Sequence, residues 1–305
     1  MPPESFVQVI INCSSGTINS DEVSRQVTAL FHASGLRAHV SLATSGAQLV
    51  ELAGQAAQSN NSTIVAGGGD GTISSVAAAL AGTTKTLGVL PLGTLNHFAR
   101  DLNIPLDLEG AINIIREGHT KSVDVGEVNG QIFINNSSLG LYPSIVRERQ
   151  KQQRLGYKKW PAFLWAAVAV LRRYPFLNVR LITGGEEFSS RTPFVFVGNN
   201  QYEMEGLSIG GRRRLCAGEL SLYISHRTGR LGLLRLALRA MFRRLRDEKD
   251  FSAMTTGEVW IQTKHKRLRV AADGEITVMK PPLHYRIRPA ALRVFVPAPG
   301  TEPST

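Results

Sequence analysis

The first 125 residues alternate short apolar runs, rich in β-branched residues, with Ala- and Leu-rich stretches of helical period. The expected strands are residues 6–12, 36–42, 62–66, 86–90 and 121–128, and the expected helices are residues 20–34, 45–58, 72–81, 94–101 and 107–117. Strands that are joined through helices need crossover connections, which make the strands parallel and cover the sheet with helices. The pattern therefore predicts an α/β domain with a largely parallel sheet.

From Gly130 onward, the sequence changes to short apolar runs separated by turn residues. The expected strands here are residues 131–137, 177–183, 192–198, 219–225, 256–263, 268–272 and 293–296. This spacing predicts a mainly antiparallel β-sandwich, interrupted by two segments of helical period at residues 156–174 and 229–247. We place the two domains at residues 1–127 and 128–296, with a flexible tail at residues 297–305.

The net charge of the 305-residue chain, +11, is distributed unevenly. Residues 1–146 hold 6 basic and 11 acidic side chains, whereas residues 147–173 hold 8 basic and 1 acidic, and residues 212–246 hold 10 basic and 1 acidic. Such asymmetry predicts a polyanionic partner for the second half, either nucleic acid or anionic lipid headgroups.

The helix expected at residues 229–247 is basic and amphipathic, with Arg235, Arg239 and Arg243 on one side. It is either a surface helix that packs its leucines on the sheet or a helix that faces a membrane. Two tryptophans beside lysines at residues 158–165 fit an interfacial anchor or a buried core helix. No nucleic acid partner is expected, because the arginines lack interleaved stacking aromatics and no known nucleic-acid-binding module is present.

The sequence predicts a cytoplasmic protein that is peripheral on the inner face of the membrane. Its longest apolar stretch, residues 160–171, is shorter than the roughly 20 residues that a membrane span needs. The N-terminus lacks the basic start of a signal peptide. The two cysteines, Cys13 and Cys216, are too few for a disulfide framework or a four-cysteine zinc site. A homodimer is left open.

A glycine-rich turn at residues 67–72 connects an expected strand to an expected helix. Glycines at such a turn allow backbone N–H groups to approach an anion at the positive end of the helix, which favours phosphate binding. Tight packing of the turn would also explain the glycines. Asp70, which lies among them, would repel a bare phosphate, so it points to a metal-dependent nucleotide. Asp70 is also positioned to cap the helix.

Two further elements carry polar residues at turns. Residues 90–100 again lead from a strand into a helix, and in a parallel sheet Thr94 and Asn96 would emerge at the same edge as the glycine turn. The third element is Asp273 and Glu275 on either side of Gly274, which an ordinary hairpin turn would explain equally well.

Together these elements resemble the catalytic domain of the soluble diacylglycerol kinase family, which includes sphingosine and ceramide kinases and bacterial lipid kinases. The Gly-Gly-Asp-Gly-Thr motif at residues 68–72 and the Pro-x-Gly-Thr-x-Asn motif at residues 91–96 are the strongest signal. Residues 12–16 are similar to the family's Asn-Pro-x-Ser-Gly opening, so the resemblance spans nearly the whole chain.

The resemblance implies a nucleotide-binding first domain like that of phosphofructokinases and NAD kinases, and a β-rich lipid-binding second domain. It implies ATP and Mg²⁺ as cofactors, a lipid as substrate and an anionic membrane surface as partner. Glu275 would be the proton acceptor with Asp273 beside it, and Mg²⁺ would be held by Asp70 and by Asp124, which otherwise starts a turn. The residues implied to bind ATP are Asn12, Thr44, Gly68, Gly69, Asp70, Gly71, Thr72, Ile73, Ser74, Ser75, Gly93, Thr94 and Asn96.

The sequence also departs from the family pattern. Ser74 and Ser75 replace the usual Asn-Glu, and His97 replaces an Asp. Ala217 stands where the family often has an Asp that binds a structural Mg²⁺, and Glu219 is the candidate substitute. Two alternatives therefore accompany the lipid kinase: a kinase of a soluble acceptor, similar to NAD kinases, and a catalytically idle lipid- or nucleotide-binding protein. If the protein is a kinase of either kind, residues 67–72 and 273–275 are expected to converge on one triphosphate.

Overall fold

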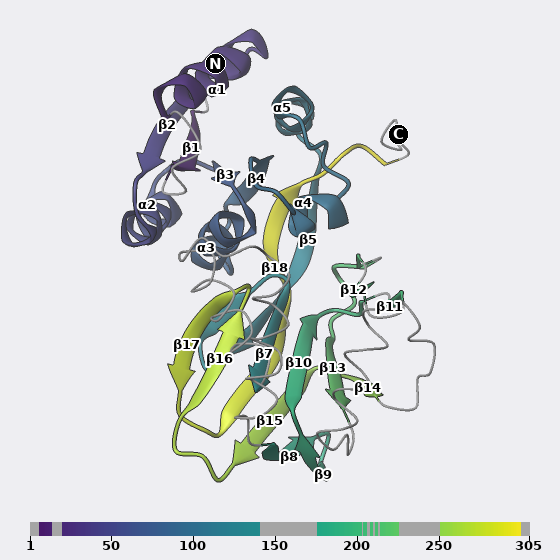
Figure 1. Ribbon diagram of the computed structural model, residues 1–305. Helices are drawn as coiled ribbons and strands as arrows, with labels where there is room; N and C mark the ends of the chain where they lie inside the picture. Colours follow the sequence, from purple (N-terminus) through teal and green to yellow (C-terminus); the bar gives the residue numbers. More distant parts are fainter. Residues whose placement is uncertain are drawn as a thin grey trace, which may run out of the picture. The chain divides into compact units, whose positions relative to one another are not determined.

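The computed structural model describes residues 6–13, 20–140, 176–202, 204–205, 208–209, 211–212, 214–225 and 251–299. The chain divides into two units, Met1–Val125 with Arg288–Thr305, and Gly126–Ile287. Helices α1 to α5 all belong to the first unit, and strands dominate the second (Figure 1). The helices expected at residues 156–174 and 229–247, and the tail from residue 300, lie outside the described residues.

The first unit is built on parallel strands in the order β2-β1-β3-β4, followed by the end of β18. Long strand β5 pairs with β18. All six residues of β4 are buried, as expected of a strand with both faces covered. The strands are β1 (Val7–Asn12), β2 (Ala38–Ala43), β3 (Thr63–Gly68), β4 (Thr86–Pro91), β5 (Thr120–Val128) and β18 (Leu283–Phe295).

Helices α1, α2, α3 and α5 pack against strands of this sheet, and α2 also packs against α3 and α1 against α5. Their lengths follow from their caps. Ser45 caps α2 and Asp107 caps α5, each with a side-chain oxygen that accepts a backbone N–H, and Gly118 ends α5 with a φ of 77°. The helices are α1 (Ser20–Ala33), α2 (Gly46–Gln58), α3 (Asp70–Leu80), α4 (His97–Asp101) and α5 (Leu108–Glu117).

The second unit is an antiparallel sandwich. One sheet has the order β14-β13-β10-β7-β16-β17, and the other contains the first half of β18 with β15, β8 and β9. The strands are β6 (Gln131–Phe133), β7 (Asn136–Gly140), β8 (Leu177–Thr183), β9 (Glu186–Thr192), β10 (Phe194–Asn199), β11 (Met204–Glu205), β12 (Ser208–Ile209), β13 (Leu220–Ser225), β14 (Phe251–Thr256), β15 (Glu258–Thr263), β16 (Leu268–Ala272) and β17 (Glu275–Met279).

The sandwich core lies between the two sheets and follows the period-2 pattern of the strands. In β8, Leu177, Val179 and Leu181 are buried, while the residues between them are exposed. They meet Val270 and Leu139 of the other sheet in one buried apolar cluster. The expected fold class, a parallel α/β domain followed by an antiparallel sandwich, is therefore confirmed.

The structure differs from the expected elements mainly in the second half. Strands β9, β14 and β17 were not expected, and β18 begins at Leu283, ten residues before the expected start. The division between units lies at Val125, close to the boundary that we place after residue 127, but residues 288–296 belong to the first unit. The reason is that Arg293 and Val294 pair in parallel with β4. Among the described helices, none is both long and apolar enough to span a membrane.

Candidate active site

The carboxyl ends of the parallel strands define one edge of the first unit. Asn12 pairs in register with Ala43, and Gly68 pairs with Pro91, so β1 to β4 end at the same level. Ligands of parallel sheets bind at this edge, outside the strand ends. The residues that follow these strands, namely the turn after Gly68, the loop after Pro91 and Thr44 after Ala43, therefore lie along the edge where a ligand is expected.

The start of α3 is open toward this edge. Its N-cap residue is Gly69, which has no side chain to accept a hydrogen bond from the first turn. The N–H groups of Thr72 and Ile73 bond to the Gly69 carbonyl at 2.9 and 3.1 Å. In contrast to α2 and α5, α3 thus begins without a side-chain cap, which leaves the positive end of the helix available to an anion.

Asp70 is the first residue of α3 and is partly exposed. Its Oδ1 accepts one long hydrogen bond, of 3.4 Å, from the N–H of Phe98. This contact ties the carboxylate to α4 without occupying both of its oxygens. Asp70 is therefore placed where it can take part in binding a cation, and its predicted metal and catalytic roles stay predictions.

The two glycine loops are in backbone contact. A Cβ atom on Gly93 would lie 2.4 Å from the Gly69 Cα, and a Cβ on Gly68 would lie 2.5 Å from Thr72 Oγ1. The N–H of Leu92 also donates to the Gly68 carbonyl at 3.1 Å. A side chain on Gly93 would push the two loops apart, and one on Gly68 would collide with Thr72 of its own turn, so these glycines reflect packing as well as access for a ligand.

Asn96 holds the second loop together. It has a left-handed backbone, with a φ of 50°, and is 7% exposed. Its Oδ1 accepts from the Gly93 N–H at 3.0 Å, and its Nδ2 donates to the carbonyls of Gly93 and Pro91 at 2.9 and 3.3 Å. Since both ends of the amide are engaged, Asn96 shapes the loop, while Thr94 and Leu95 are exposed. A contact of Asn96 with ATP stays a prediction.

The other residues predicted to bind ATP surround these loops with varied exposure. Asn12 Nδ2 donates to Thr72 Oγ1 at 3.0 Å, which fixes a buried threonine. Thr44 is exposed and its Oγ1 donates to Gln48 at 2.8 Å. Ile73 and Ser74 are buried in α3, whereas Ser75 Oγ donates to the Gly71 carbonyl at 2.8 Å. The ATP contacts of these residues stay predictions.

Asp124 lies on β5 and is buried, with 3% of its surface exposed. Its Oδ1 accepts a hydrogen bond of 2.8 Å from Ala290, a residue with a φ of 50°. The carboxylate therefore stabilises a left-handed residue of β18. Within the part of the chain that the structure describes, no group of three or more His, Cys, Asp and Glu side chains is arranged to hold a metal ion.

The acidic turn of the second unit joins β16 to β17. Asp273 and Gly274 have φ values of 47° and 86°, and Ala272 pairs with Glu275, as in a two-residue type I′ hairpin. Both oxygens of Asp273 accept backbone hydrogen bonds. Oδ2 accepts from Ile134 at 2.7 Å, and Oδ1 accepts from Asn135 and Asn136 at 2.9 and 3.0 Å.

Glu275, by contrast, is exposed, and none of the described residues forms a hydrogen bond or ion pair with its carboxylate. Asp273 is thus a positioning residue that fixes the turn to residues 134–136. Glu275 is the carboxylate that remains available to a substrate.

A buried polar network that the sequence analysis missed supports residues 134–136 from the other side. The Arg212 guanidinium is 4% exposed and donates to the carbonyls of Ile134 and Asn199 at 2.6 and 3.1 Å and to Asn135 Oδ1 at 2.9 Å. It also lies over the ring of Tyr202, 5.3 Å from the ring centroid, as in a cation–π contact. Arg212 belongs to an arginine triplet, and nothing local in the sequence distinguishes it from Arg214, which is exposed.

Residues 217–219 form a loop that is tied to the same network. The Ala217 N–H donates to Asn200 Oδ1 at 2.9 Å, and the Asn200 N–H donates to the Glu219 carbonyl at 3.0 Å. Asn200 is fully buried with a φ of 64°. Hydrogen bonds from Asn200 therefore hold this loop, and the assignment of Glu219 as a metal ligand stays a prediction.

A parallel sheet with an uncapped glycine turn at its ligand edge, together with an antiparallel sandwich carrying an acidic hairpin, defines a class of two-domain phosphotransferases. Residues 7–128 match the family described as "Diacylglycerol kinase catalytic domain", and residues 140–296 match the "YegS C-terminal NAD kinase beta sandwich-like domain". The chain therefore belongs to the YegS-like family of diacylglycerol kinase-type lipid kinases, and it is an enzyme of the kinase class.

Individual relatives agree with this membership. The "Probable lipid kinase YegS" of Escherichia fergusonii is 28% identical over 298 residues, which cover 93% of this chain and 94% of the relative. The "Probable lipid kinase YegS-like" of Yersinia pestis (strain Pestoides F) is 40% identical over 119 residues, or 37% of this chain and 40% of the relative. A crystal structure of a "putative diacylglycerol kinase" from Bacillus anthracis str. Sterne shares the fold, with a TM-score of 0.76 at 21% identity, covering 96% of this chain and 97% of that one.

Proposed function

We propose that this kinase transfers the γ-phosphoryl group of ATP to a hydroxyl of a diacylglycerol-like or sphingoid lipid at the surface of an anionic membrane. The observation that carries the proposal is the start of α3, where the Gly69 N-cap leaves the helix without a side-chain cap beside Asp70. Helix N-termini of this kind bind phosphate through their backbone N–H groups. Family membership supports the kinase class, and the acceptor lipid and the membrane are the proposal.

The residues of the chain divide the work as follows. Backbone N–H groups at the start of α3 and the loop bearing Thr94 bind the triphosphate. Glu275 accepts the proton of the lipid hydroxyl while that oxygen bonds to the γ-phosphorus and the bond to the ADP oxygen breaks. Asp273 keeps Glu275 in place through its three backbone hydrogen bonds.

Asp70 fits a role in holding Mg²⁺. Mg²⁺ commonly uses one or two protein carboxylates and completes its shell with water and phosphate oxygens, so a cluster of three acidic side chains is unnecessary. Among the described residues, one hydrogen bond of 3.4 Å reaches the Asp70 carboxylate, whereas Asp124 Oδ1 accepts a bond of 2.8 Å. When bound, the ion would neutralise charge on the transferred phosphoryl group.

The direct test uses purified protein, γ-labelled ATP, Mg²⁺ and mixed vesicles that contain diacylglycerol and sphingosine. Reactions with NAD and with water alone run in parallel. The lipid proposal predicts label in the organic extract, in a product that is absent when Asp70→Asn protein is used. Lipid vesicles without either hydroxyl lipid serve as the acceptor control.

The other outcomes contradict the proposal in distinguishable ways. Label that enters only NAD would identify a kinase of a soluble acceptor. Binding of ATP without label in any product, under conditions where an active lipid kinase is a positive control, would identify a protein that binds without catalysis.

A further inference from the structure

The sandwich of the second unit has two chemically different ends. One end carries the acidic hairpin after Ala272. The other carries residues 264–267, which connect β15 to β16 and read Lys-His-Lys-Arg, followed by Arg269 on the strand. Since β16 spans five residues at about 3.4 Å each, roughly 14 Å separates its two ends. The basic end is therefore separate from the site proposed for phosphoryl transfer.

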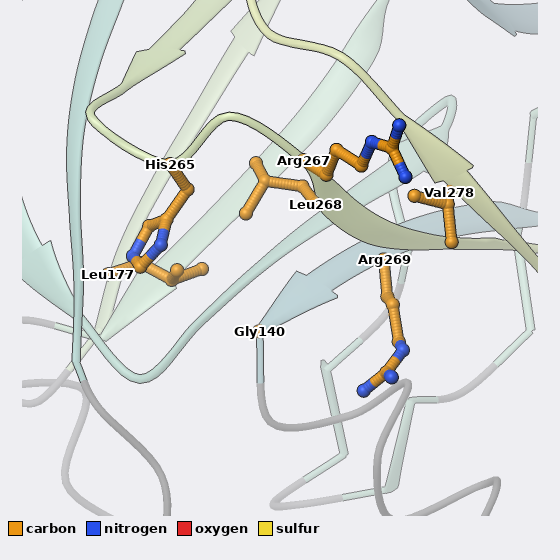
Figure 2. A pocket seen from close by; sticks show the side chains of 7 residues that line it. All are labelled: Gly140, Leu177, His265, Arg267, Leu268, Arg269 and Val278. Carbon is orange, nitrogen blue, oxygen red and sulfur yellow. The ribbon is translucent and has the colours of Figure 1, made fainter.

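This basic end contains a cavity of about 390 Å³. Its lining combines three basic residues, His265, Arg267 and Arg269, with three aliphatic ones, Leu177, Leu268 and Val278, and with Gly140. Figure 2 shows the aliphatic side chains interspersed among the basic ones, with Val278 beside Arg267. Arg269 pairs with Val278 across the hairpin, so a cation and an exposed apolar group lie side by side.

The cations of this surface lack acidic partners in the described part of the chain. Lys264, Lys266, Arg267 and Arg269 are exposed, and none of them forms an ion pair or side-chain hydrogen bond with a described residue. Two other exposed arginines of the unit are paired, Arg180 with Glu187 and Arg286 with Glu127. A group of unpaired cations concentrates positive potential at this end.

Val278 adds an exposed apolar group to this basic surface, because 57% of its surface is exposed although it lies on a strand. Arginines bind phosphate oxygens through their fork of N–H donors, and an adjoining aliphatic wall suits the glycerol and upper acyl region of a lipid. A nucleic acid site would instead place aromatic side chains between the cations for base stacking. None of the seven lining residues is Phe, Tyr or Trp.

We propose that the surface formed by residues 264–267, Arg269 and Val278 binds the headgroup of an anionic phospholipid in a bilayer, as a docking site separate from the acceptor site. The ligand features that this surface would recognise are a phosphate group and the aliphatic chain next to it. The proposal concerns a lipid that does not react, so it can be tested without ATP and does not depend on turnover.

The test compares sedimentation of the full-length protein with vesicles of phosphatidylcholine alone and with vesicles that also contain phosphatidylglycerol. We expect binding only to the anionic vesicles, and a roughly thirtyfold loss of affinity in the Arg267→Gln/Arg269→Gln variant, since each basic residue near an anionic surface contributes about fivefold. The matched control, Arg116→Gln/Lys121→Gln, removes two exposed charges from the first unit and should bind like wild type. Salt should weaken wild type more than the double variant.

Two further arms identify the ligand. Val278→Ser should lower binding severalfold while preserving the salt dependence. If glycerol 3-phosphate, at the same phosphate concentration as the vesicles, competes with vesicle binding, the surface is a site for free phosphate and the lipid assignment is overturned. If wild type binds DNA and the arginine double variant does not, the surface is a nucleic acid site and the lipid assignment is also overturned. Equal binding by wild type and the double variant, with unchanged thermal stability in both, would remove this surface as a docking site. Turnover on a micellar acceptor should be unchanged in the double variant. Loss of vesicle binding can therefore be distinguished from loss of kinase activity.

Discussion

The two acidic turns of the molecule use the same residue types for different purposes. In the first unit, Asp70 follows Gly69 at the start of α3 and receives one hydrogen bond of 3.4 Å. In the second unit, Asp273 precedes Gly274 and receives three hydrogen bonds of 2.7 to 3.0 Å. An aspartate with satisfied oxygens holds structure, whereas one with an available oxygen can bind a ligand. The number of hydrogen bonds that each carboxylate accepts, and not the residue type, therefore distinguishes the two aspartates.

Asp70→Asn tests the available member of this comparison and should have the largest effect. Removing the charge while keeping the shape should lower kcat by about a thousandfold, or about 4 kcal/mol, because electrostatic organisation around the phosphoryl group is lost. The thermal midpoint should change little. The matched control is Glu109→Gln, which removes an exposed acid from the first turn of α5. A kcat near the wild-type value would show that Asp70 only supports the helix start.

Asp273→Asn tests the engaged member. An amide nitrogen cannot accept backbone N–H groups, so at least one donor among residues 134–136 loses its partner, which should lower the free energy of unfolding by about 3 kcal/mol. Urea denaturation measures this change. Asp107→Asn should cost only about 0.5 kcal/mol or less, because this carboxylate accepts a single N–H, from Gly110 at 2.7 Å, and the Asn oxygen can still accept it. Equal costs for the two variants would contradict the role assigned to Asp273.

Glu275→Gln tests the difference between Glu275, which is available to a substrate, and Asp273, which holds the second turn. Loss of the proton acceptor should reduce kcat by about a hundredfold near pH 7 while ATP affinity and stability stay unchanged. Glu186 provides the control, because it also begins a strand after a two-residue glycine turn and is exposed. Glu186→Gln should retain full activity. Parallel loss of ATP binding in the Glu275 variant would assign this residue to nucleotide binding instead.

The smallest effect is expected at Tyr285, which supports the loop that Asp273 holds. Its hydroxyl lies 3.0 Å from Ser137 Oγ, and full burial raises the pKa of Tyr285. Tyr285→Phe should cost about 1 kcal/mol at pH 7. Above pH 10 the tyrosine ionises in the unfolded chain and stays protonated in the fold, which lowers the free energy of unfolding of wild type. The difference in free energy of unfolding between wild type and Tyr285→Phe should therefore narrow. A constant difference up to pH 11, measured by urea denaturation, would contradict this assignment.

Much of the first unit follows from local sequence. The expected strand and helix ranges agree with β1 to β5 and α1 to α5 to within a few residues, since amphipathic period and caps act over one or two turns. The exception is α4, which begins at His97 instead of residue 94, because Asn96 adopts a left-handed backbone to close its loop. The glycine turn and Asp70 were also found, since strand, turn and helix are contiguous.

The second unit was less predictable. Strand β9 is an exposed edge strand without apolar alternation, so no pattern marks it. Strand β17 could have been inferred, because Asp273-Gly274 is a type I′ hairpin signal and the residues after it alternate. The basic residues at 264–269 were visible as charge, but not the apolar wall that β8 and β17 place beside them.

By itself, the sequence determined the two fold classes, the glycine turn with Asp70, and the acidic turn with Asp273 and Glu275, because each depends on residues close together in the chain. Only the tertiary structure decided that Asp273 is saturated by N–H groups more than a hundred residues away, that Arg212 is a buried clamp, and that the end of β18 completes the first sheet. The physical reason is that long-range hydrogen bonds depend on strand register, and packing of both sheets sets that register cooperatively.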